Sequence, residues 1–262
     1  MSENILEINN LSKYFGGLAA VSDCSLNVKR GTITGIIGPN GSGKTTLFNL
    51  IAGNLKSSSG VVTFDEENIT DVPSYELFSK GLLRTFQIAH EFSNLSVLEN
   101  LMMVPGNQSG EKLMTALLKP KLVLEEEAIV KEKAKEVVDF LNLSHLSNEL
   151  AGNLSGGQKK LLELGRTMMV DAKLVLLDEV GAGVNRTLLK DLGTAIEKLN
   201  KEKGYTFCMI EHDMDFIGRL CDPVIVMAEG SVLFEGSVDE VKKDEKVIES
   251  YLGRGSKLKD SN

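Results

Sequence analysis

A glycine-rich run early in the chain carries the clearest chemical signal. Residues 38–46 fit the pattern G-x-x-x-x-G-K-[ST], in which backbone N–H groups converge on a phosphate at the start of a helix. We expect Lys44 to reach the terminal phosphates and the Thr45 hydroxyl to bind Mg²⁺. The residues predicted to form this phosphate loop are Gly38, Pro39, Asn40, Gly41, Ser42, Gly43, Lys44, Thr45 and Thr46.

Polar residues follow two predicted strands. Asp178 and Glu179 come directly after the apolar run 174–177, and His212 follows the strand 206–210. Ligands of open α/β sheets bind at the carboxyl ends of strands, so we expect Asp178 to hold Mg²⁺ through water. Glu179 would orient or deprotonate an attacking water, and His212 would contact the γ-phosphate. An isolated strand-end histidine is more often structural, but the other parts of this set favour the functional interpretation of His212.

A second glycine motif, Leu154–Gln158, reads Leu-Ser-Gly-Gly-Gln and precedes a predicted helix from 159 to 170. Ser155 can cap that helix, and Gly156 and Gly157 expose backbone N–H groups. One nucleotide does not need two helix N-termini from separate subdomains. We therefore infer a symmetric pair, in which each copy's motif serves the nucleotide of the other copy.

The surrounding elements predict an α/β fold with a parallel core sheet. A strand at 32–37 precedes the phosphate loop and a helix at 45–52 follows it, while short strands are expected at 5–8 and 22–28. Strands alternate with helices after residue 170, and a helical block occupies the middle of the chain. We expect a core made of residues 1–87 and 171–262, closed by a surface helix at 238–252, and a helical subdomain at 88–170.

Composition sets the class of the protein. The chain has 262 residues, 42% hydrophobic and 25% charged, with a net charge of −8, which is ordinary for a globular protein and gives no basic surface for nucleic acid. Cys24, Cys208 and Cys221 lack metal-ligand spacing and are expected to be buried in a reducing compartment. The N-terminus lacks signal-peptide features and no apolar run approaches about 18 residues, which predicts a cytoplasmic protein whose membrane role needs partner subunits.

Together these residues resemble an ABC-type ATPase, and the resemblance covers nearly the whole chain. Its most specific mark is Leu154–Gln158, with a phosphate loop upstream and an Asp-Glu pair downstream. The resemblance implies a P-loop NTPase core with an antiparallel β subdomain and an inserted α-helical subdomain, using ATP and Mg²⁺. Two cassettes would enclose two ATP molecules head to tail. Ser155, Gly156, Gly157 and Gln158 would then belong to the nucleotide site, and Ser155, Gly156 and Gln158 would contact the γ-phosphate held by the other cassette's Lys44.

The resemblance also implies individual roles. Gln87 corresponds to the glutamine that touches Mg²⁺ and reports to the membrane subunits, Glu179 to the catalytic base and His212 to the switch histidine. Phe15, next to Tyr14, would stack on adenine, and Val21 would touch the ribose or base. Two departures affect the loop after Glu179: Val180 replaces a usual Pro, and Asn185-Arg186 replaces a frequent Asp-Pro.

Within that family the chain is similar to the G-type ATPase subunit of branched-chain amino acid importers. The similar segments are 13–17, 84–87, 95–101, 247–253 and an insert near 106–124. Importers of urea and other amides, and lipopolysaccharide-export cassettes, share several of these motifs and stay as alternatives. A ribosome- or DNA-acting ABC regulator would need a second cassette or a long coiled coil, and a P-loop kinase would leave the Leu154–Gln158 motif unexplained.

The importer resemblance implies a set of partners. These are transmembrane permease subunits, a second cassette of the same or a different chain and, through the assembled transporter, a periplasmic or extracellular substrate-binding protein. No nucleic acid is expected. The chain would be cytoplasmic and attached peripherally to the inner face of the membrane. The apolar stretch 92–104 either docks on the membrane subunits or forms the helical subdomain's own core.

Overall fold

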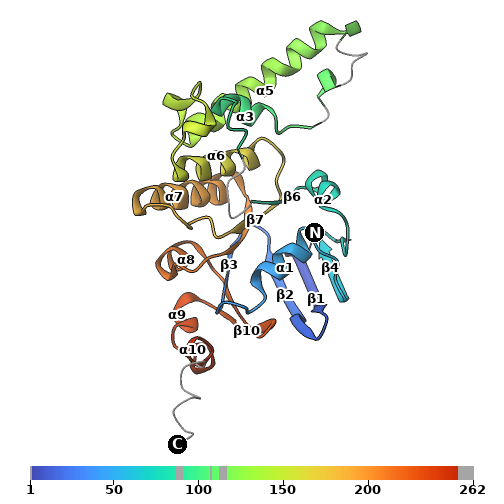
Figure 1. Cartoon of the computed structure of the whole chain (residues 1–262), viewed down its shortest axis with the longest axis vertical. Coiled ribbons are helices and arrows are strands. Elements are labelled where there is room, and N and C mark those ends of the chain that lie inside the picture. The colour runs from blue at the N-terminus through green and yellow to red at the C-terminus, as the bar shows by residue number, and fades with distance from the viewer. Residues whose placement is uncertain (1, 86–90, 107, 112–116, 253–262) are drawn as a thin grey trace, which may run out of the picture. The chain divides into compact units, whose positions relative to one another are not determined.

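The computed structural model describes residues 2–85, 91–106, 108–111 and 117–252 (Figure 1). They form two compact units. The core unit holds the described residues up to Arg84, together with Lys173–Gly181 and those from Ile196 onward, and the helical unit holds Thr85–Ala172 and Ala182–Ala195. The sequence-based division kept residues 182–195 in the core, whereas these residues, which include the first turns of a long helix, pack in the helical unit.

The main sheet of the core unit has the strand order β10-β9-β3-β8-β7-β6. All neighbours pair in parallel except β10 and β9, which are antiparallel. Every residue of β3, β7 and β8 is buried, which is why the sequence shows nearly continuous apolar runs there. The strands are β3 Ile33–Ile37, β6 Leu82–Arg84, β7 Leu174–Asp178, β8 Thr206–Ile210, β9 Val224–Ala228 and β10 Ser231–Gly236.

A second, antiparallel sheet has the order β2-β1-β4-β5. Its long strands are β1 Asn4–Phe15 and β2 Leu18–Lys29, with β4 Ser59–Phe64 and β5 Glu67–Asn68 beside them. The sequence predicted much shorter strands at 5–8 and 22–28. The difference arises because register shifts between Ile8 and Leu11, and again before Lys13, interrupt the apolar alternation from which strands are predicted.

Helix α1, Lys44–Ile51, lies within the apolar core that both sheets share. Its Leu47 and Phe48 are fully buried in one cluster with Leu6 of β1 and Met227 of β9. The other helices of the core unit are α2 Ser74–Lys80, α8 Met214–Leu220, α9 Val238–Val241 and α10 Glu245–Leu252. The predicted surface helix at 238–252 is therefore two helices, interrupted where the Asp244 carboxylate accepts the N–H of Val247.

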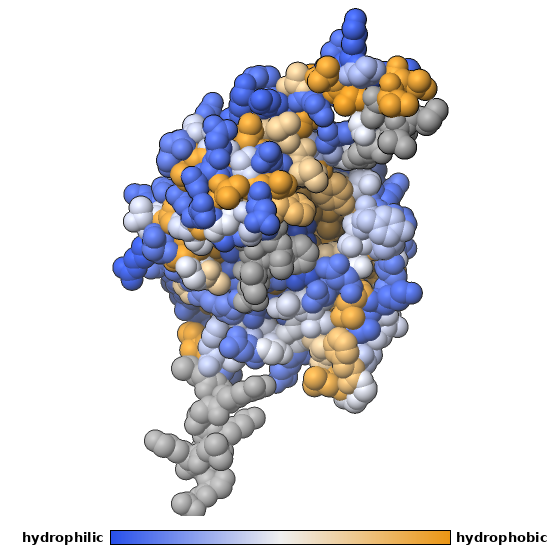
Figure 2. All heavy atoms as spheres, turned by 45° about the horizontal axis from the view of Figure 1, so that its top comes forward, coloured by the Kyte–Doolittle hydropathy of each residue, from blue (hydrophilic) through white to orange (hydrophobic). Residues whose placement is uncertain are grey.

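The helical unit contains α3 Val97–Met102, α5 Pro120–Phe140, α6 Gly156–Met168 and the first part of α7, Arg186–Lys203. Gly165 permits close packing of α6, since a Cβ there would lie 2.7 Å from Cδ1 of Leu141. Apolar side chains gather on the surface where α5 begins (Figure 2), including the exposed Leu117, Leu118 and Leu124. Within the described residues, no helix combines the length and apolar character needed to cross a membrane.

All three cysteines are buried and free. Burial raises the pKa of the Cys24 thiol to about 11 and that of Cys208 to about 12, and it also raises the pKa of Cys221. A thiol with such a pKa holds almost no thiolate near neutral pH, so these side chains behave as small apolar residues.

Candidate functional site

The phosphate loop connects β3 to α1 and leaves the start of that helix open. The N-cap residue Gly43 lies in the left-handed region with φ of 97° and has no side chain with which to cap the helix. The first N–H groups of a helix have no partner within the helix. Here they stay available to an anion, and the helix dipole favours its binding.

Two glycines of the loop are required by the contacts around them. A Cβ on Gly38 would lie 2.1 Å from the backbone oxygen of Met227, and one on Gly43 would lie 2.4 Å from the backbone oxygen of Ala20. Neither oxygen can move without displacing a strand. The loop therefore packs directly against neighbouring backbone, which fixes the direction of its N–H groups.

Lys44 is held in place by the loop itself. Its ammonium group donates hydrogen bonds to the carbonyl oxygens of Gly38 at 2.8 Å and Pro39 at 3.1 Å. Burial lowers the pKa of Lys44, while the charges of Glu179 and Asp178 oppose that shift. A partly desolvated cation at the mouth of an open helix start is suited to a polyphosphate.

A pocket of about 380 Å³ brings most of the predicted core-unit site together. The half-exposed ring of Phe15 forms part of its wall, as expected of a ring that stacks on a base. Its lining residues are Phe15, Leu18, Ala19, Ala20, Asn40, Gly41, Ser42, Gly43, Lys44, Thr45, Thr46, Glu179 and His212.

Val21, which was predicted to touch the ribose or base, is not among the residues that line the pocket. Val21 is 0% exposed and belongs to the apolar core, so its side chain faces away from the pocket. Ala19 and Ala20 form that wall instead.

Asp178 ends β7 as a buried carboxylate with a strong partner. Arg84, at the end of β6, donates to Asp178 Oδ2 at 2.6 Å and to Asn49 Oδ1 of α1 at 2.6 Å. The guanidinium thereby connects the two strand ends to the phosphate-loop helix. Sequence reasoning gave Arg84 no role, although a charged residue directly after buried Leu82 and Leu83 needs a partner and could have been noticed on that ground.

The oxygens available to Mg²⁺ fit that ion. Mg²⁺ commonly takes one or two protein oxygens and completes its shell with water and substrate phosphate oxygens. Thr45 is an exposed residue on the pocket wall, and Asp178 offers a carboxylate at the carboxyl end of β7 in the main sheet. Gln87, the third predicted metal contact, lies outside the described residues.

Glu179 and His212 face each other across the ends of β7 and β8. Glu179 Oε1 lies 3.0 Å from Nε2 of His212, and both side chains line the pocket. Glu179 has a left-handed backbone, with φ of 49°, which is uncommon for a residue with a side chain and recurs at functional sites. A carboxylate positioned by an imidazole, beside a phosphate loop, can accept a proton from water.

In the helical unit, the Leu154–Gln158 motif forms the start of α6, and the side chains of Ser155 and Gln158 cap that helix. Gln158 N–H donates to Ser155 Oγ at 3.4 Å, and Ser155 N–H donates to Gln158 Oε1 at 2.9 Å. This is a reciprocal capping box. Gly157 is required by packing, because a Cβ there would lie 2.4 Å from Cδ1 of Leu188.

The two departures in the loop after Glu179 preserve local structure. Val180 is buried, as an apolar residue in the place of Pro can be. Asn185 Oδ1 accepts the N–H of Leu188 at 2.9 Å, so Asn185 performs the capping that Asp would provide at the start of α7. Arg186 takes the first helical position, where Pro is favoured but not required.

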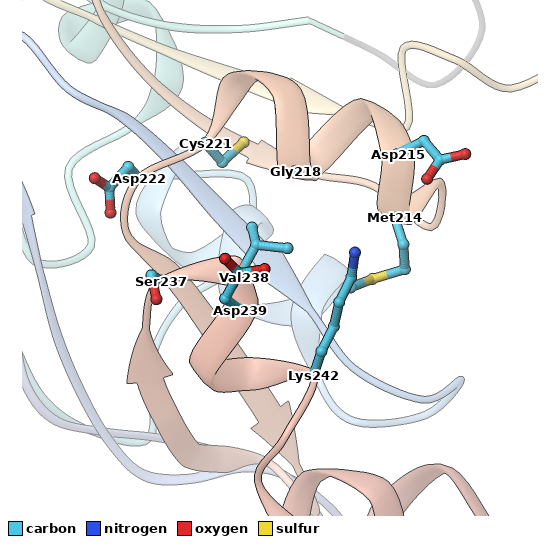
Figure 3. Close-up of a pocket in the computed structure, with 9 residues that line it drawn as sticks. All are labelled: Met214, Asp215, Gly218, Cys221, Asp222, Ser237, Val238, Asp239 and Lys242. Atoms are coloured by element: carbon cyan, nitrogen blue, oxygen red, sulfur yellow. The ribbon is translucent and has the colours of Figure 1, made fainter.

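A second hollow, of about 410 Å³, lies between α8 and α9 of the core unit (Figure 3). Asp215, Asp222 and Asp239 line it, and Lys242 is the one cationic residue among its lining side chains. Its carboxylates would repel phosphates. The two pockets have similar volumes, but only the pocket beside the phosphate loop has a lining suited to a phosphate.

Comparison with known proteins identifies the family. Residues 21–182 match the family model described as ABC transporter, and residues 231–257 match the model described as branched-chain amino acid ATP-binding cassette transporter. The chain is 43% identical over 249 residues to the "Probable branched-chain amino acid transport ATP-binding protein LivG" of Archaeoglobus fulgidus, covering 95% of each chain.

Solved structures agree with this match. A nucleotide-free ATP-binding cassette from an ABC transporter superposes with a TM-score of 0.81 and 41% identity, covering 94% of this chain and 98% of that one. A cassette in its ADP conformation gives a TM-score of 0.81 and 40% identity, covering 96% of this chain and all of that one. The fold predicted from the sequence is thus confirmed. The chain belongs to the ATP-binding cassette family of ABC transporters.

Proposed function

We propose that this chain is the ATP-hydrolysing subunit of an importer of branched-chain amino acids. The observation that carries the enzymatic part is the single pocket in which the phosphate loop, Lys44, Glu179 and His212 meet. The substrate class is supported by the LivG relative and by the match of residues 231–257 to a cassette model of that transporter group.

In this proposal the core unit binds the nucleotide. The adenine stacks on Phe15, and the phosphates lie on the open start of α1 with Lys44 at the terminal phosphates. Thr45 and Asp178 would hold Mg²⁺ beside the bound ATP, where the ion would neutralise charge on the terminal phosphates. Gln87 is assigned to the same ion by the family resemblance.

Glu179 supplies the chemistry of the attacking water. Its carboxylate orients the water and accepts its proton, while His212 keeps the carboxylate in place and contacts the γ-phosphate. Phosphoryl transfer depends mainly on positioning and charge stabilisation, and this chain provides both through Lys44 and the fixed N–H groups of the loop.

A second cassette completes the site in this proposal. Ser155, Gly156, Gly157 and Gln158 of one cassette contact the γ-phosphate bound by the other, in a head-to-tail pair. ATP binding closes the pair and hydrolysis reopens it.

Membrane attachment would occur through permease subunits, on the inner face of the membrane, with a substrate-binding protein joining on the outer side. Exposed apolar side chains of the helical unit support such docking. Leu124 of α5 is solvent-exposed, as are Leu117 and Leu118 just before that helix and Phe92 and Met103 in the stretch 92–104. Val97 and Leu101 of that stretch are fully buried, so it also contributes to the core of its own unit.

The test compares the native chain with Glu179→Gln. The variant keeps the shape of the side chain but cannot accept the proton, so we expect ATP binding to persist and a nucleotide-bound dimer to accumulate on gel filtration. Turnover should fall by roughly 10²-fold or more, the usual contribution of general-base catalysis. Full turnover by the variant would refute the assignment of Glu179.

The substrate is tested by uptake of labelled leucine, isoleucine and valine in host cells without redundant carriers. Cells with the native gene should take up the label, and cells carrying Glu179→Gln should not. Equal uptake in both would refute the amino acid assignment and leave import of other amides or lipid export to be tested.

A further inference from the structure

Glu211 is a buried carboxyl group for which the proposed mechanism has no use. It follows β8 directly, between Ile210 and His212, and its residue is only 4% exposed. Burial raises its pKa, and the nearby charge of Glu179 adds to that effect, while hydrogen bonds from Gly181 and His212 oppose it. An acidic residue is seldom buried this deeply unless its oxygens have partners.

The partners of Glu211 lie on both sides of the proposed catalytic pair. Its Oε1 accepts the backbone N–H of Gly181 at 2.7 Å, two residues after Glu179. Its Oε2 accepts the backbone N–H of His212 at 3.3 Å. One side chain thus satisfies a backbone donor in the loop that carries Glu179 and another in the residue that carries the imidazole.

Two more hydrogen bonds join the same segments. Glu179 N–H donates to the backbone oxygen of Ile210 at 2.9 Å, and the Glu179 carboxylate lies 3.0 Å from His212 Nε2. The left-handed backbone of Glu179 persists only where its surroundings hold it. Gly181, held by Glu211, follows this strained residue closely and limits how the loop can relax.

We propose that Glu211 is a positioning residue for ATP hydrolysis, which fixes the loop 179–181 against His212 so that Glu179 keeps its reactive orientation. The proposal rests on the proposed function of Glu179 as the general base. Glu211 itself does not touch the reactants, because it is buried and is not among the residues that line the pocket.

The chemistry of the contact explains why a carboxyl group is needed. Two N–H donors require two acceptor oxygens, and Glu provides both in one side chain. Gln keeps one acceptor for Gly181 but would present an NH₂ group to the N–H of His212. Ala would leave both buried donors without a partner. The variants Glu211→Gln and Glu211→Ala therefore form a graded series.

The experiment measures kcat, KM for Mg-ATP and ATP affinity in the full-length chain and in both variants. For Glu211→Ala we expect kcat to fall about 10- to 100-fold, the size of effect that a displacement of about 1 Å produces, with KM and ATP affinity within about twofold of native. Glu211→Gln should retain an intermediate kcat. Glu240→Ala is the matched control, because the Glu240 carboxylate also accepts a backbone N–H, from Ser237 at 2.8 Å, but lies in α9 and outside the pocket lining.

Imidazole NMR gives a readout that general destabilisation would not change. The chain has only three histidines, so His212→Ala identifies the signal of His212. In folded Glu211→Gln this signal should move while those of the other histidines stay in place. An unchanged kcat and an unchanged His212 signal in Glu211→Gln would overturn the proposal, even if Glu211→Ala fails to fold.

Different results would refute the proposed roles of Glu179 and Glu211. If Glu179→Gln loses turnover while the Glu211 variants match Glu240→Ala, Glu211 has no positioning role and the proposed function stands. If Glu179→Gln keeps full turnover, the general-base assignment fails, and the positioning role of Glu211 fails with it.

Discussion

The phosphate loop and the Leu154–Gln158 motif are both glycine-rich helix starts, yet the structure treats their backbone donors differently. At α1 the cap is Gly43, which has no side chain, so the first N–H groups face an open pocket. At α6 the cap is Ser155, whose hydroxyl and backbone N–H are both engaged by Gln158. The first start has no side-chain cap, whereas at the second the N–H of Gln158 is satisfied within its own motif.

The phosphate loop can bind an anion with groups from one chain alone. The Leu154–Gln158 motif is suited to assist an anion that is already bound elsewhere. The phosphate loop adds its own cation, Lys44, to the free donors of the helix start. The Leu154–Gln158 motif contains no charged residue. Its capping box instead fixes the Ser155 oxygen as an acceptor, which leaves the hydroxyl proton free to be donated outward. A site of this kind is suited to add one hydrogen bond to a phosphate that is already bound elsewhere.

The largest expected effect comes from Lys44→Ala, which removes the charge from the open helix start. Hydrogen bonds to charged groups contribute about 1.5–3 kcal/mol each, so ATP affinity should fall by roughly 10- to 100-fold or more. Titration with a fluorescent ATP analogue measures this. Native-like affinity in the folded variant would mean that the backbone donors alone define the site.

A smaller effect is expected from Ser155→Ala, which breaks the capping box of α6. Loss of such a cap costs about 1 kcal/mol of stability, and ATP binding at the phosphate loop should stay native. Turnover should fall about tenfold or more if Ser155 also contacts the partner's γ-phosphate, as a lost hydrogen bond to a charged group implies.

Ser237→Ala is the control for this variant, since Ser237 and Glu240 form the same capping box at α9. Thermal unfolding and turnover are measured for both. Equal stability losses with a turnover defect only in Ser155→Ala would support the trans contact. Equal turnover in the two variants would restrict Ser155 to a structural role.

The smallest effect is a dependence of ATP affinity on pH that involves only the phosphate loop. Burial lowers the pKa of Lys44 in the nucleotide-free protein, and bound phosphate should raise that pKa again. Affinity should therefore be highest below the pKa of the free protein and decline as pH rises from that value toward the pKa of the complex. Lys44→Ala should remove this decline, whereas Ser155→Ala should keep it. A decline that persists in Lys44→Ala would assign it to another group.

The sequence predicted most of the fold because its strongest signals are local. The phosphate loop has a fixed spacing, and the strands before Asp178 and His212 are buried on both faces and therefore appear as short apolar runs. The antiparallel strands β1 and β2 were predicted too short, because register shifts interrupt their alternation.

Two charged residues at strand ends, Arg84 and Glu211, show what a sequence pattern cannot supply. Arg84 ends β6 and Glu211 follows β8, which indicates only that they need partners. Their partners, Asp178 and Asn49 for Arg84 and the N–H groups of Gly181 and His212 for Glu211, lie far along the chain or on the backbone. Which segments meet is decided by strand order and not by local spacing. The assignments of Lys44, Glu179 and Ser155 remain predictions that their variants test.

The buried thiols have a practical consequence for measuring motion in the assembled transporter. Cys24 and Cys208 belong to the apolar core, Cys221 is buried at the wall of the hollow between α8 and α9, and the raised pKa values of all three suppress thiolate formation. Maleimide reagents react with exposed thiolates, so the native chain should label very slowly near pH 7. A single cysteine introduced on the surface could then carry a spin or fluorescent label without removal of the native ones. Distances between two cassettes could be followed through the ATP cycle in a protein whose core is otherwise unaltered.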